Sequence, residues 1–117
     1  MIKIGQTINN ILSNDADVTQ IVGNKIYPMV ADTGTTFPFI VYKKSSYTPV
    51  YTKDGISNKS ATVEIIIAAE DYETSVNLAD IVFIAISAKD RKFRLVSNTE
   101  DYIEETFIQN LIFKIEK

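Results

Sequence analysis

The sequence predicts an α+β fold, in which a mainly antiparallel sheet of about four to five strands is packed by two principal helices. Two neighbouring stretches support this prediction. In residues 59–69 one strand face is wholly apolar, because alternate positions hold Ala61, Val63, Ile65, Ile67 and Ala69. In residues 72–88 apolar side chains recur at helical spacing, at Val76, Ala79, Val82, Phe83 and Ile86. Since both stretches must bury an apolar face, the helix is expected to lie on the sheet.

The length and composition are those of one globular domain. The chain has 117 residues, of which 45% are hydrophobic and 23% are charged, so we expect residues 1–117 to form a single domain. The net charge of -3 argues against a nucleic-acid-binding protein, since neutralising phosphates requires a basic excess.

Residue types needed for common catalytic sites are missing. Cysteine and histidine are absent, which removes thiolate nucleophiles, the commonest general base and the commonest transition-metal ligand. The four glycines are scattered singly, so no phosphate-binding loop is predicted. Serines have no histidine to activate them. We therefore expect no enzymatic activity and no cofactor.

The N-terminal residues lack the long apolar run of a secretory signal. The longest apolar tract, Leu78 to Ile86, is interrupted by Asp80 and is shorter than the roughly 20 residues that span a membrane. We expect no membrane association, and a chain that stays in the cytoplasm unless a larger particle carries it out.

The first elements are predicted to be helical. Residues 3–13 place Ile4, Ile8, Ile11 and Leu12 on one helical face. Asn14 or Asp15 is expected to cap a second, short turn that ends at Gly23. A short strand over residues 25–27 then stops at Pro28.

The middle of the chain contains its least settled segment. Residues 39–44, rich in aromatic and β-branched side chains, predict a strand after a polar loop over residues 31–36. Residues 45–58 mix strand signals with Pro49 and a turn-forming Lys53-Asp54-Gly55. They fit an exposed arm or hairpin with Asp54-Gly55 at its tip, or an ordinary loop.

The helix over residues 72–88 is expected to begin at Asp71, whose carboxylate can accept first-turn N–H groups. Its apolar side chains extend beyond the Val76/Phe83 stripe to Leu78, Ile81 and Ala85. A helix that is apolar nearly all round is usually enclosed on two sides. In so small a domain, the second side is expected to be a neighbouring subunit.

The C-terminal part predicts more strands. After a polar turn at residues 88–91, residues 92–97 and 102–106 fit two strands joined near Asn98-Thr99. Residues 107–115 alternate as a final strand. Open edges of such a sheet can pair with another chain.

One dense acidic run holds Glu100, Asp101, Glu104 and Glu105. A metal-dependent hydrolase would need several of these oxygens to converge, whereas neighbouring strand residues point to opposite faces. A solvated acidic surface is the favoured interpretation. In a ring, the same four residues could line an acidic channel that does not retain DNA phosphates.

Several short motifs occur in an order that resembles one protein family. They are Val22-Gly23-Asn24-Lys25-Ile26-Tyr27-Pro28, then Phe37-Pro38-Phe39-Ile40-Val41-Tyr42, then an alternating strand, then Leu78-Ala79-Asp80 in a helix. This order is similar to the tail-completion or tail-terminator family of long-tailed bacteriophages, across roughly residues 5–90. Lys25 stands where arginine is common in the family, and Phe39 where tyrosine is usual.

The resemblance implies an α+β subunit of the virion tail that forms a ring, typically a hexamer. Such a ring caps the head-proximal end of the tail tube, stops its growth and contacts the head connector, while DNA passes through without specific binding. The role needs no cofactor. Subunit or partner contacts are then expected at Tyr47, Val50, Tyr51, Leu78, Ile81 and Ala85. The alternative is a small cellular α+β ligand-binding or regulatory module unrelated to phage.

Overall fold

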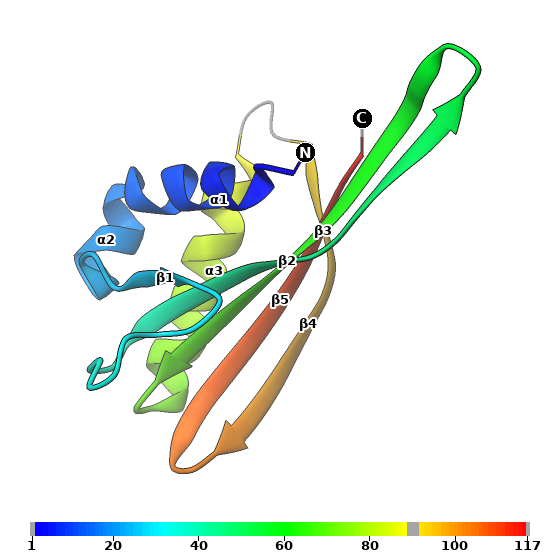
Figure 1. The fold of residues 1–117 in the computed structure, drawn as a ribbon. Coiled ribbons are helices and arrows are strands. Elements are labelled where there is room, and N and C mark those ends of the chain that lie inside the picture. The colour runs from blue at the N-terminus through cyan, green and yellow to red at the C-terminus, as the bar shows by residue number, and fades with distance from the viewer. Residues whose placement is uncertain (1, 89–91, 117) are drawn as a thin grey trace.

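The described residues form two layers, one of a single sheet and one of three helices, which confirms the predicted α+β fold class (Figure 1). The computed structural model describes residues 2–88 and 92–116, without the side chains of residues 56–58. The elements are α1 (Ile4–Ser13), α2 (Ala16–Val22), β1 (Ile26–Pro28), β2 (Phe39–Thr52), β3 (Gly55–Ala69), α3 (Tyr72–Ser87), β4 (Phe93–Ile103) and β5 (Thr106–Glu116). Within the described ranges, no helix is both long and apolar enough to cross a bilayer.

The strands form one five-stranded sheet in the order β1-β2-β3-β5-β4. Three of the four pairings are antiparallel, and only the short β1 runs parallel to β2. The pairing of β2 with β3 runs from Phe39↔Ala68 to Thr52↔Gly55, whereas β5 pairs with β3 only between Ser60 and Ala69. The β2–β3 hairpin therefore extends well beyond the rest of the sheet (Figure 1).

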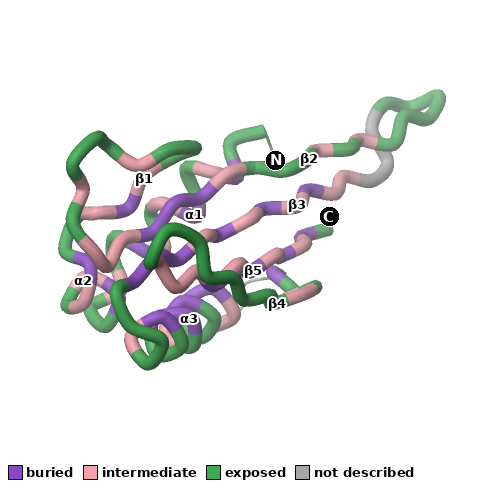
Figure 2. The backbone as a smooth tube through the Cα atoms, turned by 90° about the horizontal axis from the view of Figure 1, so that it is seen from below, coloured by how far each residue is buried: buried purple, intermediate pink, exposed green. Residues whose placement is uncertain are grey.

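The three helices cover one face of the sheet, and the core lies between them (Figures 1 and 2). The alternation predicted for residues 59–69 is confirmed, because Ile65 and Ile67 are fully buried against the helices. Facing side chains from β2 and β5, such as Ile40 and Phe113, are also fully buried. In the part of the chain that the structure describes, no helix lies on the opposite face of the sheet (Figure 1).

Two aspartates start helices as the sequence predicts. Asp15 Oδ1 accepts the backbone N–H groups of Asp17 at 3.0 Å and of Val18 at 3.1 Å. Asp71 Oδ2 accepts the N–H of Thr74 at 3.0 Å. These hydrogen bonds with Thr74 hold the pKa of the Asp71 carboxyl below its usual value. Gly23 ends α2 with a positive φ of 65°, which an L side chain rarely adopts.

The prediction of two strands joined near Asn98-Thr99 is wrong. Residues 93–103 form the single strand β4, and the chain reverses at Glu104-Glu105 instead. Both turn residues have positive φ, 51° and 61°, which a two-residue hairpin loop of type I′ requires. Glutamate has no preference for that conformation, so composition does not reveal the turn. Of the polar turn expected at residues 88–91, positions 89–91 lie outside the described residues.

Candidate assembly surfaces

The far end of the β2–β3 hairpin forms a two-stranded projection, which we call the arm and define as residues 49–59. Among the described residues no third strand pairs with it, because the β5 partners of β3 begin at Ser60. Lys53 and Asp54 connect its strands, and Gly55 follows them with a φ of 113°. The molecule is 52 Å along its longest axis, and the arm extends at one end (Figure 1).

Three predicted contact residues lie on or beside the arm. Tyr51 is 74% exposed and Val50 is 48% exposed. Tyr47, at the base of the arm, is half-buried and packs against the core of its own subunit. Large apolar side chains held in water mark a surface that another molecule can cover, so Tyr51 and Val50 stay candidates for contacts between molecules.

The three contact residues predicted on α3 lie differently. Leu78 is 0% exposed and Ala85 is 4% exposed, so both side chains belong to the core of the subunit. Ile81 is half-buried and packs against the same core. Helical spacing gives the angle between side chains but not the direction in which the helix turns its buried face. The apolar side chains that α3 exposes are Tyr72, Val76, Phe83 and Ile84.

A groove runs between α3 and β4. One part, of about 260 Å³, lies between Val76 and Phe83 on the helix and Leu95 and Asn98 on the strand. A second part, of about 390 Å³, lies beside Tyr102 and Phe107 near the β4–β5 turn. Both parts are lined by Tyr72, Glu100 and Gln109, so they lie next to each other. We call the whole depression the α3–β4 groove.

A polar network forms the floor of the α3–β4 groove. Gln109, only 2% exposed, donates from Nε2 to Glu100 Oε2 at 2.7 Å and to Ser75 Oγ at 3.4 Å. The Tyr72 hydroxyl donates to the same Glu100 oxygen at 2.7 Å. The donors Gln109 and Tyr72 lower the pKa of Glu100, and the carboxylate raises the pKa of Tyr72. The network joins α3, β4 and β5.

Aromatic rings close the end of the groove nearest the β4–β5 turn. Phe107 lies between two tyrosines, with ring centroids 4.7 Å from Tyr102 and 5.9 Å from Tyr72. Tyr72 and Tyr102 are 51% and 58% exposed. This cluster was not predicted from the sequence, because its members come from three separate elements and only the fold brings them together.

The four acidic residues do not converge. Glu100 is paired with Gln109, which faces the helices, whereas the adjacent Asp101 is paired with Ile108 on the uncovered face. Glu104 and Glu105 occupy the turn beyond them. All four are exposed. Among the described residues, no group of three or more potential ligands could hold a metal ion.

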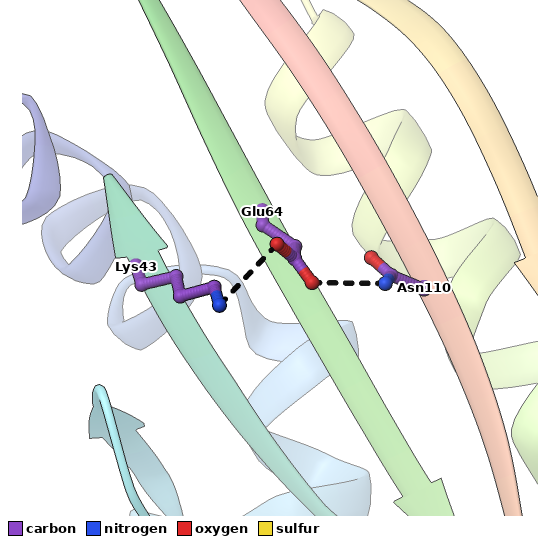
Figure 3. A network of polar contacts seen from close by, with 3 residues as sticks. All are labelled: Lys43, Glu64 and Asn110. Atoms are coloured by element: carbon purple, nitrogen blue, oxygen red, sulfur yellow. Dashed lines mark hydrogen bonds and ion pairs between the residues drawn. The ribbon is translucent and has the colours of Figure 1, made fainter. Parts of the chain in front are cut away.

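The uncovered sheet face carries paired charges across its middle strands (Figure 3). Lys43 Nζ lies 3.6 Å from Glu64 Oε2, and Asn110 Nδ2 donates to Glu64 Oε1 at 2.9 Å. Closer to the arm, Glu116 lies 3.1 Å from Lys114 and 4.0 Å from Arg94. Exposed ion pairs contribute little to stability, so these contacts are expected to add little to the free energy of unfolding.

Comparison with known proteins identifies the family. Residues 6–109 match the family described as tail completion protein gp17. Among solved structures, the fold is similar to a chain of the "Virion of native gene transfer agent (GTA) particle", with a TM-score of 0.76 and 17% sequence identity over 93% of this chain and 90% of that chain. No sequence among the curated proteins matches. Since the family match spans most of its length, the chain belongs to the tail completion protein gp17 family.

Proposed function

We propose that this tail protein forms a ring, sixfold in the simplest case, that caps the head-proximal end of a phage tail tube. The ring would end growth of the tube and join it to the head connector. The observation that carries the proposal is family membership over residues 6–109. The virion particle that contains a chain of similar fold adds support for the architecture alone.

Family membership favours this role over a small cellular ligand-binding or regulatory module. Tail completion is a structural task, in which the product is a joined particle and not a converted substrate. The exposed arm and the α3–β4 groove supply two different surfaces on each subunit. Head-to-tail rings require this, because each subunit contacts its two neighbours through different patches.

We further propose that the acidic residues near the β4–β5 turn border the path of the DNA. Asp101, Glu104 and Glu105 are exposed at the end of the molecule opposite the arm (Figure 1), and Glu100 lies beside them within the groove. Like charge would keep phosphates from adhering during DNA passage. Reversing these four charges in an assembled particle should reduce DNA delivery, and unchanged delivery would exclude this role.

Assembly of the pure protein tests the main proposal. Native mass measurement and negative-stain imaging should detect a closed ring, either free or on the ends of tail tubes. Added to polymerising tube protein, the chain should stop elongation and give tubes capped at one end. Continued elongation at saturating amounts of the chain, with no density on tube ends, would overturn the proposal.

A further inference from the structure

We infer that the arm of one subunit docks into the α3–β4 groove of the next subunit, and that this contact is what closes the ring head to tail. The inference rests on the proposed ring and names the surfaces that build it. Its occupant is a second copy of this chain, and its key side chain is Tyr51.

The two surfaces lie at different ends of the molecule. The arm projects at one end of the 52 Å axis, and the aromatic end of the groove adjoins the β4–β5 turn at the other (Figure 1). An arm therefore cannot reach the groove of its own subunit. Because the surfaces differ, repeated docking is heterologous, and it generates a ring when the rotation closes.

The chemistry of the two surfaces is complementary. Asp80 and Glu100 place two acidic side chains in the groove, and none of the described residues that line it is basic. The arm carries Lys53 and Lys59 against a single acid, Asp54. Opposite charges steer encounter and fix the register of an interface.

The apolar parts also correspond. Tyr51, 74% exposed on the arm, is the large aromatic side chain that a docked arm can bring to Tyr72, Tyr102 and Phe107. Aromatic rings that lie partly open in a pocket are typical anchors of protein interfaces. Docking would cover apolar side chains on both surfaces that the isolated subunit exposes to water.

Cross-linking tests this contact directly, since the chain has no cysteine of its own. We would place one cysteine on the arm by Thr52→Cys, an exposed position next to Tyr51, and one in the groove by Val76→Cys, and treat assembled rings with a short bis-maleimide. The double variant should give a ladder of covalent oligomers that ends at the ring size. The matched control joins Thr52→Cys with Gln20→Cys, at an exposed position of α2, and should give no ladder.

A shortened variant separates docking from the ring itself. Replacing residues 49–59 with Asn-Gly joins Thr48 to Ser60, which are already paired across the hairpin. This variant should keep the wild-type unfolding midpoint but form no ring. Rings from the shortened protein, or equal cross-linking of the control pair, would overturn the docking and leave the ring proposal standing. Absence of any ring from the wild-type chain, even on tube ends, would overturn the ring proposal instead.

Charge exchange provides a second readout. Lys53→Glu with Lys59→Glu should weaken ring assembly by roughly twofold to fivefold per lost pair, and adding Asp80→Lys should restore part of it. The loss should shrink at high salt, which screens exposed charges. Equal assembly of all three proteins at low salt would contradict the charge pairing on which the docking depends.

Discussion

The two halves of the β2–β3 hairpin have the same backbone pairing but opposite surroundings. We call the part of the subunit outside the arm the body. In the body, the strands are covered by helices, and Ile40, Ile65 and Ile67 are fully buried. In the arm, the same strands continue with no third strand beside them, and Tyr51 is 74% exposed (Figure 2). Backbone pairing thus extends over the whole hairpin, whereas among the described residues fully buried side chains occur only in its body half. We therefore expect the body to supply most of the stability of the subunit, and the arm mainly to add exposed surface.

Local features distinguish the arm and the stretch of β2 that leads into it. The register of β2 against β3 shifts between Lys44 and Ser46 and again between Val50 and Tyr51. Such bulges bend a strand and increase its twist. The arm also contains Pro49 and two lysines, which discourage uncontrolled pairing at exposed edges. These features oppose unspecific pairing of the exposed strand edges of the arm.

The largest expected difference between the halves concerns truncation of one aromatic side chain in each. Phe113→Ala removes a fully buried ring and should lower the free energy of unfolding by about 3–5 kcal/mol. Tyr51→Ala, on the arm, should change it by less than about 0.5 kcal/mol. Urea unfolding of the isolated subunit measures both. A comparable loss in Tyr51→Ala would show that the arm contributes to the fold.

Much of the body could be predicted from the sequence, because burial on one face leaves a periodic trace. The alternation around Ile65 and the helical spacing around Val82 predicted a strand and a helix in contact. The reversal at Glu104-Glu105 could not be predicted, because its positive φ values run against the preference of glutamate. The pairing of two long strands, β4 and β5, imposes the turn on residues that do not favour it.

A comparison of the two hairpin turns gives the next largest effect. Replacing Glu104-Glu105 with Asn-Gly, the pair that type I′ turns favour, should stabilise the subunit by about 1–2 kcal/mol. The same replacement at Lys53-Asp54 is the matched control. In that turn the positive φ falls on Gly55, so the change should stay within about 0.5 kcal/mol.

Thermal and urea unfolding at high salt would measure both turn variants, since salt screens the change in surface charge. An equal gain in the free energy of unfolding at both turns would mean that the positive φ values of Glu104 and Glu105 do not destabilise the wild-type turn.

A smaller difference is expected when one locally hydrogen-bonded side chain is removed from the body and one from the arm. Asp15→Ala removes the acceptor for two N–H groups at the start of α2 and should cost about 1 kcal/mol. Thr52→Ala removes the bond from Thr52 Oγ1 to the Gly55 carbonyl at 3.1 Å, and should cost less than about 0.5 kcal/mol because the site is exposed. Matched losses in urea unfolding would contradict the division between body and arm.

The candidate surfaces were less accessible to sequence reasoning than the core. Exposed apolar residues on the arm follow from their place between Pro49 and the turn. On α3, however, periodicity could not show that Leu78 faces the core and Val76 the groove. Glu100 lies 28 residues after Tyr72 and nine residues before Gln109 in the sequence. The register of β4 against β5 pairs Glu100 with Gln109, and the packing of α3 adds Tyr72.

The smallest expected effect concerns the groove floor, where the proposed docking surface meets the core. In the folded subunit Gln109 and Tyr72 hold the pKa of Glu100 below its ordinary value. The unfolded chain lacks these donors and so binds the proton of Glu100 more tightly. The stability that Glu100 contributes is thus fully present above the ordinary glutamate pKa, about 4.3, and is lost as the pH falls through the lowered pKa. Glu100→Gln should therefore flatten the acid side of the unfolding profile. Glu105→Gln, which removes an equal charge at the turn, is the matched control. If the free energies of unfolding of wild type and Glu100→Gln vary with pH in parallel, the hydrogen bonds of Glu100 do not contribute to the stability of the subunit.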